Sequence, residues 1–258
     1  MRWHPVFLVV VLFIMFLIPA YSLMDPDFGW HISSGQYILE HGLPRTDIYT
    51  YTAMDFPWIH HEWLADVLNY LVYSAGGFTA LAIFYSALWT AALALVTRLR
   101  WPSLIVVLGA LGMSSFAGVR ATAWTILFCA VAYYILNYAP RRMRWALPLL
   151  FALWANIHGG FAIGLAYVCF VSLTSRDWGL LRVVLLSGLA TLVNPYGISI
   201  YHEILTTLSD SSLRGRVAEW QSLLLPTVTH LFLCVWIARF VVGDWRDYRQ
   251  YLSFDVVL

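Results

Sequence analysis

The fold class follows from one stretch near the start of the chain, Pro5-Val6-Phe7-Leu8-Val9-Val10-Val11-Leu12-Phe13-Ile14-Met15-Phe16-Leu17-Ile18-Pro19-Ala20-Tyr21-Ser22-Leu23. It carries no charge and matches the roughly 20 residues that a helix needs to cross the hydrocarbon core of a bilayer. It lacks a clear small-x-small cleavage site, so we interpret it as a membrane helix and not as a signal peptide. The whole chain is 61% hydrophobic and only 11% charged, with a mean hydropathy of +0.72. This composition is typical of integral membrane proteins.

Seven further apolar runs follow, and together they predict an all-α polytopic protein: one transmembrane domain over residues 1–258 with about eight membrane helices. Two short runs share the polar sequence Asn156-Ile157-His158-Gly159-Gly160, so we expect their turn to lie below the membrane surface and to face a cavity. The expected spans are 5–23, 78–97, 102–119, 122–139, 145–158, 160–175, 179–194 and 226–242.

The basic residues, all of them arginines, predict the orientation. With the N-terminus in the cytoplasm, most arginines fall inside and only four fall outside, namely Arg45, Arg120, Arg214 and Arg216. The positive-inside rule is then satisfied with both termini in the cytoplasm. The net charge is only +1, which argues against a polyanion-binding surface and excludes nucleic acid as an expected partner. The three cysteines lie in apolar runs, where we expect buried hydrophobic side chains.

Two long segments, 24–77 and 195–225, are expected on the outer side. The first contains two amphipathic stretches, 28–41 and 60–75, which end at Gly42 and at Gly76-Gly77. We expect both to form helices that lie along the outer membrane interface. Asp27 stands where the N-cap of the first helix is expected.

Polar residues gather in this first outer segment. Asp25, Asp27 and His31 directly follow the first span, and His61 and Glu62 begin the second interfacial helix. A carboxylate at this depth can act as a general base or as a metal ligand. The five residues together could hold a divalent metal ion, the one cofactor that we consider. The alternative is a capping Asp27, a solvated Asp25 and a solvated start of the second helix.

Further polar residues stand at the outer ends of later spans. Arg120 could bind a phosphate or could extend toward the lipid head groups. Asn156 and His158 could line the recessed turn or serve packing. Asn194-Pro195-Tyr196-Gly197 is a strong helix terminator, and Glu219 precedes the last expected span.

Taken in order, these motifs resemble the GT-C superfamily of membrane glycosyltransferases, which use polyprenyl-phosphate-linked sugars. The resemblance is to the N-terminal module shared by protein O-mannosyltransferases, aminoarabinose transferases and oligosaccharyltransferase catalytic subunits. The motifs that carry it are Asp25-Pro26-Asp27-Phe28-Gly29-Trp30-His31, Gly42-Leu43-Pro44-Arg45-Thr46-Asp47, His61-Glu62-Trp63-Leu64, Trp154-Ala155-Asn156-Ile157-His158-Gly159-Gly160, Asn194-Pro195-Tyr196-Gly197 and Glu219-Trp220.

The resemblance implies inverting sugar transfer to an acceptor hydroxyl on the outer face of a bacterial cytoplasmic membrane. Asp25 or Asp27 would be the general base, with Asp25 favoured because Asp27 has an expected capping role, and Glu62 is a further catalytic candidate. Arg120, with His31 or His158, would stabilise the phosphate leaving group. The remaining expected substrate-binding residues are His61, Asn156, Asn194, Tyr196 and Glu219.

Typical members of the superfamily are longer, so we expect either a fragment or a minimal form that holds the shared module.

Two other functions remain open from the sequence, a transporter or flippase and an inactive module. A transporter or flippase would instead place charges near the midplane, or would break helices in matched halves, and the sequence has neither pattern. A catalytically inactive module of a glycan-assembly complex is the third candidate.

Overall fold

The computed structural model describes residues 3–22, 25–52, 56–114 and 117–210. Within these ranges the secondary structure is helical, with one isolated bridge between Thr46 and Pro57 and no strand. The all-α prediction is therefore confirmed for the described residues. The expected span 226–242 and residues 211–225 of the second outer segment, including Glu219, lie outside them.

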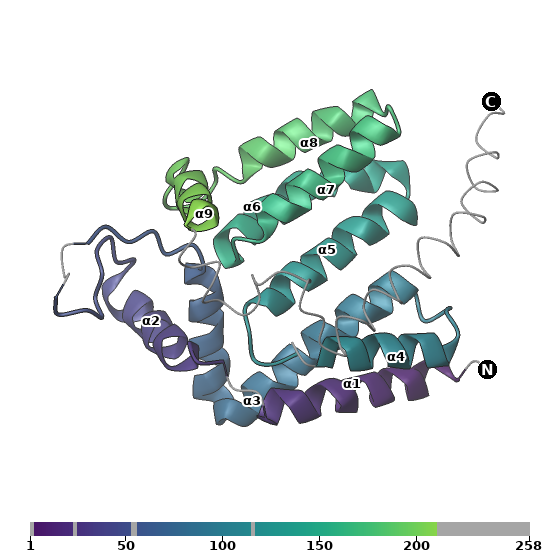
Figure 1. Cartoon of the computed structure of the whole chain (residues 1–258), viewed down its shortest axis with the longest axis horizontal. Coiled ribbons are helices and arrows are strands. Elements are labelled where there is room, and N and C mark those ends of the chain that lie inside the picture. The colour runs from purple at the N-terminus through teal and green to yellow at the C-terminus, as the bar shows by residue number, and fades with distance from the viewer. Residues whose placement is uncertain (1–2, 23–24, 53–55, 115–116, 211–258) are drawn as a thin grey trace.

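Most of the helices stack side by side and run in one general direction, as Figure 1 shows. The helix α2, the first half of α3 and the helix α9 gather at one end of this stack. The helices are α1 (Pro5–Ser22), α2 (Phe28–His41), α3 (Trp63–Thr97), α4 (Ser103–Ser114), α5 (Thr122–Asn137), α6 (Leu147–Ile157), α7 (Phe161–Thr174), α8 (Trp178–Ala190) and α9 (Ser199–Ser209), with the short 3₁₀ helix η1 (Arg141–Ala146) before α6.

In the described part of the chain, two helices, α1 and α3, are long and apolar enough to cross a membrane. Four others, α4, α5, α7 and α8, are apolar but shorter. The apolar runs in the sequence are longer than the helices, because the runs include the residues that end the helices. The run 102–119, for example, gives a helix that ends at Ser114.

The predicted interfacial helix 60–75 and the predicted span 78–97 form one kinked helix, α3. The kink lies at Gly76 and Gly77, where Gly77 has φ 63° and ψ −158°. Glycine reaches this positive φ without the steric cost that a side chain would bring. The kink turns the first half of α3 toward α2, while the second half packs in the stack (Figure 1).

The two ends of the stack differ in charge. The connections after α3, α5 and α7 lie at the end where the chain begins, and those after α1, α4, α6 and α8 lie at the opposite end (Figure 1). The first set carries six arginines, among them Arg144, whose Nη1 lies 2.6 Å from Oδ2 of Asp177. The six are Arg98, Arg100, Arg141, Arg142, Arg144 and Arg176. The spatial arrangement thus keeps the charge asymmetry from which we predicted the orientation.

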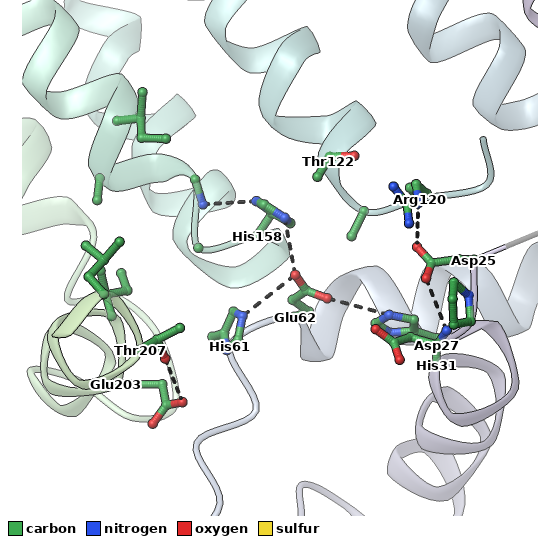
Figure 2. A pocket seen from close by; sticks show the side chains of 18 residues that line it. Asp25, Asp27, His31, His61, Glu62, Arg120, Thr122, His158, Glu203 and Thr207 are labelled. Carbon is green, nitrogen blue, oxygen red and sulfur yellow. Dashed lines mark hydrogen bonds and ion pairs between the residues drawn. The ribbon is translucent and has the colours of Figure 1, made fainter. Parts of the chain in front are cut away.

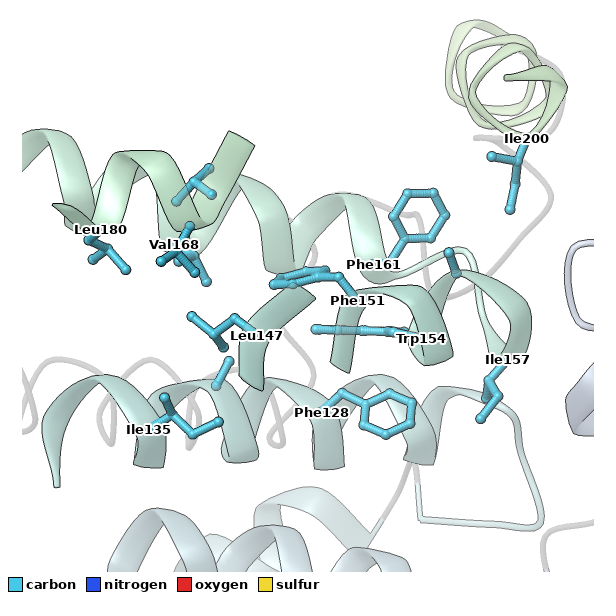
Figure 3. Close-up of a cluster of buried hydrophobic side chains, with 14 of the residues drawn as sticks. Phe128, Ile135, Leu147, Phe151, Trp154, Ile157, Phe161, Val168, Leu180 and Ile200 are labelled. Atoms are coloured by element: carbon cyan, nitrogen blue, oxygen red, sulfur yellow. The ribbon is translucent and has the colours of Figure 1, made fainter. Parts of the chain in front are cut away.

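Two clusters of buried apolar side chains hold the helices together. One joins α1, α3 and α4 around Phe16 and Trp89. The other joins α5, α6, α7 and α8, and in it Trp154 stacks on Phe151 with ring centroids 5.4 Å apart, as Figure 3 shows. Because Trp154 lies in the last turn of α6, this packing fixes the position of the polar α6–α7 turn that follows.

Gly35 sets how closely α2 approaches α3. A Cβ atom at this position would lie 2.1 Å from the backbone oxygen of Asp66. We expect Gly35→Ala to lower the free energy of unfolding by about 1–3 kcal/mol, as overpacking does elsewhere. Gly29→Ala is the matched control, because it lies in the same helix and its Cβ would meet no atom within 4 Å. Thermal unfolding in detergent measures both; equal midpoints for the two variants would contradict this close packing.

Candidate functional site

A cavity of about 510 Å³ lies at the end of the stack where α2, α3, α5, α7 and α9 meet. Figure 2 shows that it is lined from several parts of the chain. It brings together seven residues that the sequence predicted as site residues: Asp25, Asp27, His31, His61, Glu62, Arg120 and His158. The recessed turn 156–160 was expected to face a cavity, and His158, Gly159 and Gly160 do line it.

Asp25 pairs with Arg120. The Nε of Arg120 lies 3.1 Å from Oδ2 of Asp25, and the backbone N–H of Asp27 donates to Oδ1 of Asp25 at 3.1 Å. Both carboxylate oxygens of Asp25 are thus engaged. Asp27 occupies the N-cap position of α2 but makes no side-chain capping bond, so its expected capping role was wrong. Its side chain is exposed and lines the cavity.

Glu62 lies among imidazoles that come from three places in the chain. Its carboxylate is 3.3 Å from Nε2 of His158, 3.7 Å from Nε2 of His61 and 3.8 Å from Nε2 of His31. Burial alone would raise the pKa of Glu62, but the surrounding imidazoles, His158 foremost, outweigh burial and hold the pKa below its ordinary value. Glu62 is therefore ionised at neutral pH.

The tautomer of His158 follows from its neighbours. Its Nδ1 accepts the backbone N–H of Gly160 at 3.0 Å and lies 2.7 Å from the hydroxyl of Thr125. The indole N–H of Trp154 donates to that hydroxyl at 3.1 Å. Since Nδ1 is an acceptor, the ring proton stands on Nε2, which faces Glu62. His158 thus presents an N–H donor to the cavity.

Asp66 and His60 do not line the cavity but support His31 from behind it, and they were not among the predicted residues. The side chain of Asp66 is 0% exposed. Its Oδ1 lies 2.6 Å from Nδ1 of His31 and its Oδ2 lies 2.8 Å from Nε2 of His60. Asp66 follows Glu62 by four residues, so the two share a helix face. The spacing of Asp66 from Glu62 was visible in the sequence, but the contact between Asp66 and His31 was not.

The charge of His31 predicts a pH dependence of stability. Burial alone would lower the pKa of His31, but the hydrogen bond and the charge of Asp66, together with two further carboxylates, outweigh burial and raise the pKa from 6.5 to about 8. A raised pKa in the folded state stabilises the fold fully below pH 6.5, and this contribution is lost as the pH rises through about 8.

We therefore expect the thermal midpoint of the wild type to fall between about pH 6.5 and 8, and this part of the fall to be absent from His31→Gln. Thermal unfolding at closely spaced pH values checks it. An identical decline in both proteins would contradict the assignment of the charge to His31.

Three predicted substrate-binding residues, Asn156, Asn194 and Tyr196, do not line the cavity, and their role in binding stays a prediction. The side-chain amide of Asn156 donates to backbone oxygens of Ala152 and Val193. The side-chain amide of Asn194 donates to backbone oxygens of Thr191 and Gly197 within the α8–α9 turn. Tyr196 donates to the backbone oxygen of Pro44 at 3.3 Å. These hydrogen bonds join the first outer segment to the α8–α9 turn and join that turn to α6.

The metal hypothesis finds no support in the geometry. Among the described residues, no group of three or more His, Cys, Asp or Glu side chains is arranged to hold a metal ion. Asp25 faces Arg120 and Asp66 faces two imidazoles, so these carboxylates already have partners. We therefore propose no metal at the five residues Asp25, Asp27, His31, His61 and Glu62.

The remaining wall of the cavity comes from α9, a helix that the sequence did not predict. Glu203 and Thr207 line the cavity beside the apolar side chains of Ile204 and Leu208. The helix was missed because it follows the terminator Asn194-Pro195-Tyr196-Gly197 within a segment that we expected to be a loop.

Comparison with known proteins adds no relative. No family model, no curated protein and no solved structure matches the chain. Its function has to be inferred from the chemistry of the cavity and from the motifs of the sequence.

Proposed function

We propose that the protein is a polytopic membrane glycosyltransferase of the GT-C type that moves a sugar from a polyprenyl-phosphate donor to an acceptor hydroxyl. The observation that carries the proposal is the composition of the cavity. One part holds the exposed carboxylate of Asp27 and the guanidinium of Arg120, and another holds the apolar side chains of Ile163, Ile204 and Leu208. A donor with a charged head, a polar sugar and an apolar tail needs both kinds of surface.

Asp27 is the carboxylate best placed to act as the general base. Asp25 is held by Arg120 and by a backbone N–H. Glu62 has a lowered pKa and is therefore a weak base. Asp27 lines the cavity, is exposed and is not used as a cap, which leaves it able to receive a proton.

The transfer then proceeds in one balanced step. The acceptor hydroxyl gives its proton to Asp27, and its oxygen attacks the anomeric carbon from the side opposite the phosphate, which inverts the configuration. The bond between that carbon and the phosphate oxygen breaks, and its electron pair stays on the polyprenyl phosphate. Arg120 stabilises the charge that develops there, and Asp25 orients the guanidinium by its contact at Nε.

The outer surface of the stack favours a membrane location with several spans. Large apolar side chains are exposed on α1, which is long enough to span a membrane, and also on the shorter helices α4, α6, α7 and α8. Lipid tails can cover such side chains at no cost, whereas water cannot. They include Val6, Ile14, Leu104, Leu149, Phe170 and Leu185.

We expect residues 25–62 to face outside and the arginine-rich connections to face the cytoplasm. Tyr51 is 89% exposed and Arg100 is exposed, so both can be changed to Cys with little effect on packing. An impermeant thiol reagent applied to intact cells should label Tyr51→Cys and should label Arg100→Cys only after the membrane is opened. The opposite pattern would place the cavity in the cytoplasm and would overturn the lipid-linked donor.

A further inference from the structure

The carboxylate of Glu62 has a specific arrangement of polar neighbours. Three imidazole nitrogens surround it at 3.3 to 3.8 Å, which is longer than the roughly 2.7–3.2 Å of a good N–H···O hydrogen bond. In the described part of the chain no side chain or backbone group donates a hydrogen bond to it. A side chain that is 15% exposed, stays ionised and lines a cavity thus keeps its acceptor positions for a ligand.

The two oxygens of Glu62 each face a different N–H donor. His158 carries its proton on Nε2, which lies 3.3 Å from Oε1. His31 donates from Nδ1 to Asp66 and is protonated at neutral pH, so its Nε2 also bears a proton, 3.8 Å from Oε2. The carboxylate therefore has an N–H donor beside each oxygen, and Nε2 of His61 also lies 3.7 Å from Oε1.

We propose that Glu62, His31 and His158 form a subsite for two neighbouring hydroxyl groups of a sugar. Each hydroxyl donates its proton to one oxygen of Glu62 and accepts the N–H of the adjacent imidazole, which uses the dual character of a hydroxyl. The proposal rests on the proposed function for placing a sugar here. It assigns Glu62 to substrate binding in place of the catalytic role that the sequence suggested.

The subsite offers donors and acceptors side by side, which suits hydroxyl groups, because a hydroxyl both gives and accepts a proton in hydrogen bonds. The imidazolium of His31 lies between Glu62 and the buried Asp66, and His158 is a neutral donor at its Nε2. Because the subsite and Asp27 line the same cavity, hydroxyls held at Glu62 would keep the sugar within the cavity that also holds the proposed base.

Binding of simple glycosides to the purified protein in nanodiscs tests the subsite. The probes are the methyl glycosides of mannose, galactose and glucose, which offer both cis and trans neighbouring hydroxyls, and the deoxy analogue of each that lacks one of the pair. The readout is the ¹⁵N signals of His31 and His158 in histidine-labelled protein. We expect at least one glycoside to shift both signals and its deoxy analogue to bind at least tenfold more weakly.

Three variants separate the subsite from general effects. Glu62→Gln should lose at least tenfold in glycoside affinity, compared with the wild type at a temperature where thermal unfolding shows both proteins to be folded. Glu40→Gln is the matched control, since Glu40 is exposed on α2 and bonds Gln36. Asp27→Asn should keep glycoside binding, because it is assigned to proton transfer.

The outcomes distinguish this proposal from the transferase. If no glycoside moves the two signals, or if Glu62→Gln binds as tightly as the wild type, the subsite is overturned. If glycosides bind as expected but no lipid-linked donor is consumed, the transferase is overturned and the subsite stands. Donor turnover that survives Glu62→Gln with an unchanged KM overturns the subsite and leaves the transferase.

Discussion

Asp27→Asn is expected to lower donor turnover by about 100-fold or more while leaving the thermal midpoint unchanged. A general base contributes about 10²- to 10⁴-fold, and the amide of Asn cannot take the proton of the acceptor. Stability should not change, because the Asp27 side chain is exposed and makes no capping bond. Turnover is measured as polyprenyl phosphate released, at equal amounts of folded protein.

Asp25→Asn provides the comparison. It is nearly isosteric and removes the charge that faces Nε of Arg120, so we expect a raised KM for the donor and a smaller fall in kcat than with Asp27→Asn. Full activity of Asp27→Asn together with loss of kcat in Asp25→Asn would assign the role of general base to Asp25. Full activity in both would remove the proposed mechanism.

Arg120→Gln is expected to cost on the order of 3 kcal/mol in the transition state, or about 100-fold in turnover, by analogy with the loss of one preorganised donor. Arg120→Lys should fall between Gln and the wild type. Lys supplies the charge but not the planar fork that binds a phosphate through parallel hydrogen bonds. If Arg120 only reached the lipid head groups, Lys would replace it without loss.

Arg45→Gln is the control for a lost outer arginine. Arg45 lies over the ring of Tyr196, 4.8 Å from its centroid, and donates to the backbone oxygen of Pro195, outside the cavity. Its loss should affect stability and spare turnover. Activity that follows the thermal midpoint in all the arginine variants would assign Arg120 to anchoring and leave the phosphate without a protein partner.

Local signals in the sequence predicted the elements that form the cavity. The helix over 28–41 was predicted from Asp27 at its start, Gly42 at its end and an amphipathic pattern, and α2 spans the same residues although Asp27 makes no side-chain capping bond. The break at Gly76-Gly77 was predicted too, although the two segments remain one helix with a kink. The recessed turn at His158 followed from polar residues between two short apolar runs, and it lies in the cavity wall.

What the sequence could not supply is the choice among chemically similar side chains. Asp25 is distinguished from Asp27 by its contact with Arg120, 95 positions farther along the chain, whose Nε lies 3.1 Å from Oδ2 of Asp25. Asp66 supports the site through contacts with His31 and His60 that depend on how α2 packs on α3. Asn156 and Tyr196 resemble site residues in type, but their hydrogen bonds go to backbone oxygens and, for Asn156, also come from the indole N–H of Trp63.

Product analysis of the transfer reaction tests the central claim most directly. Purified protein in nanodiscs is incubated with polyprenyl-phosphate sugars of defined anomeric configuration and with membrane extract as the source of acceptor. The account predicts that at least one donor releases polyprenyl phosphate, that its sugar appears in a product of inverted configuration, and that Asp27→Asn forms about 100-fold less of both. No consumption of any donor, or a product that retains the configuration, would contradict it.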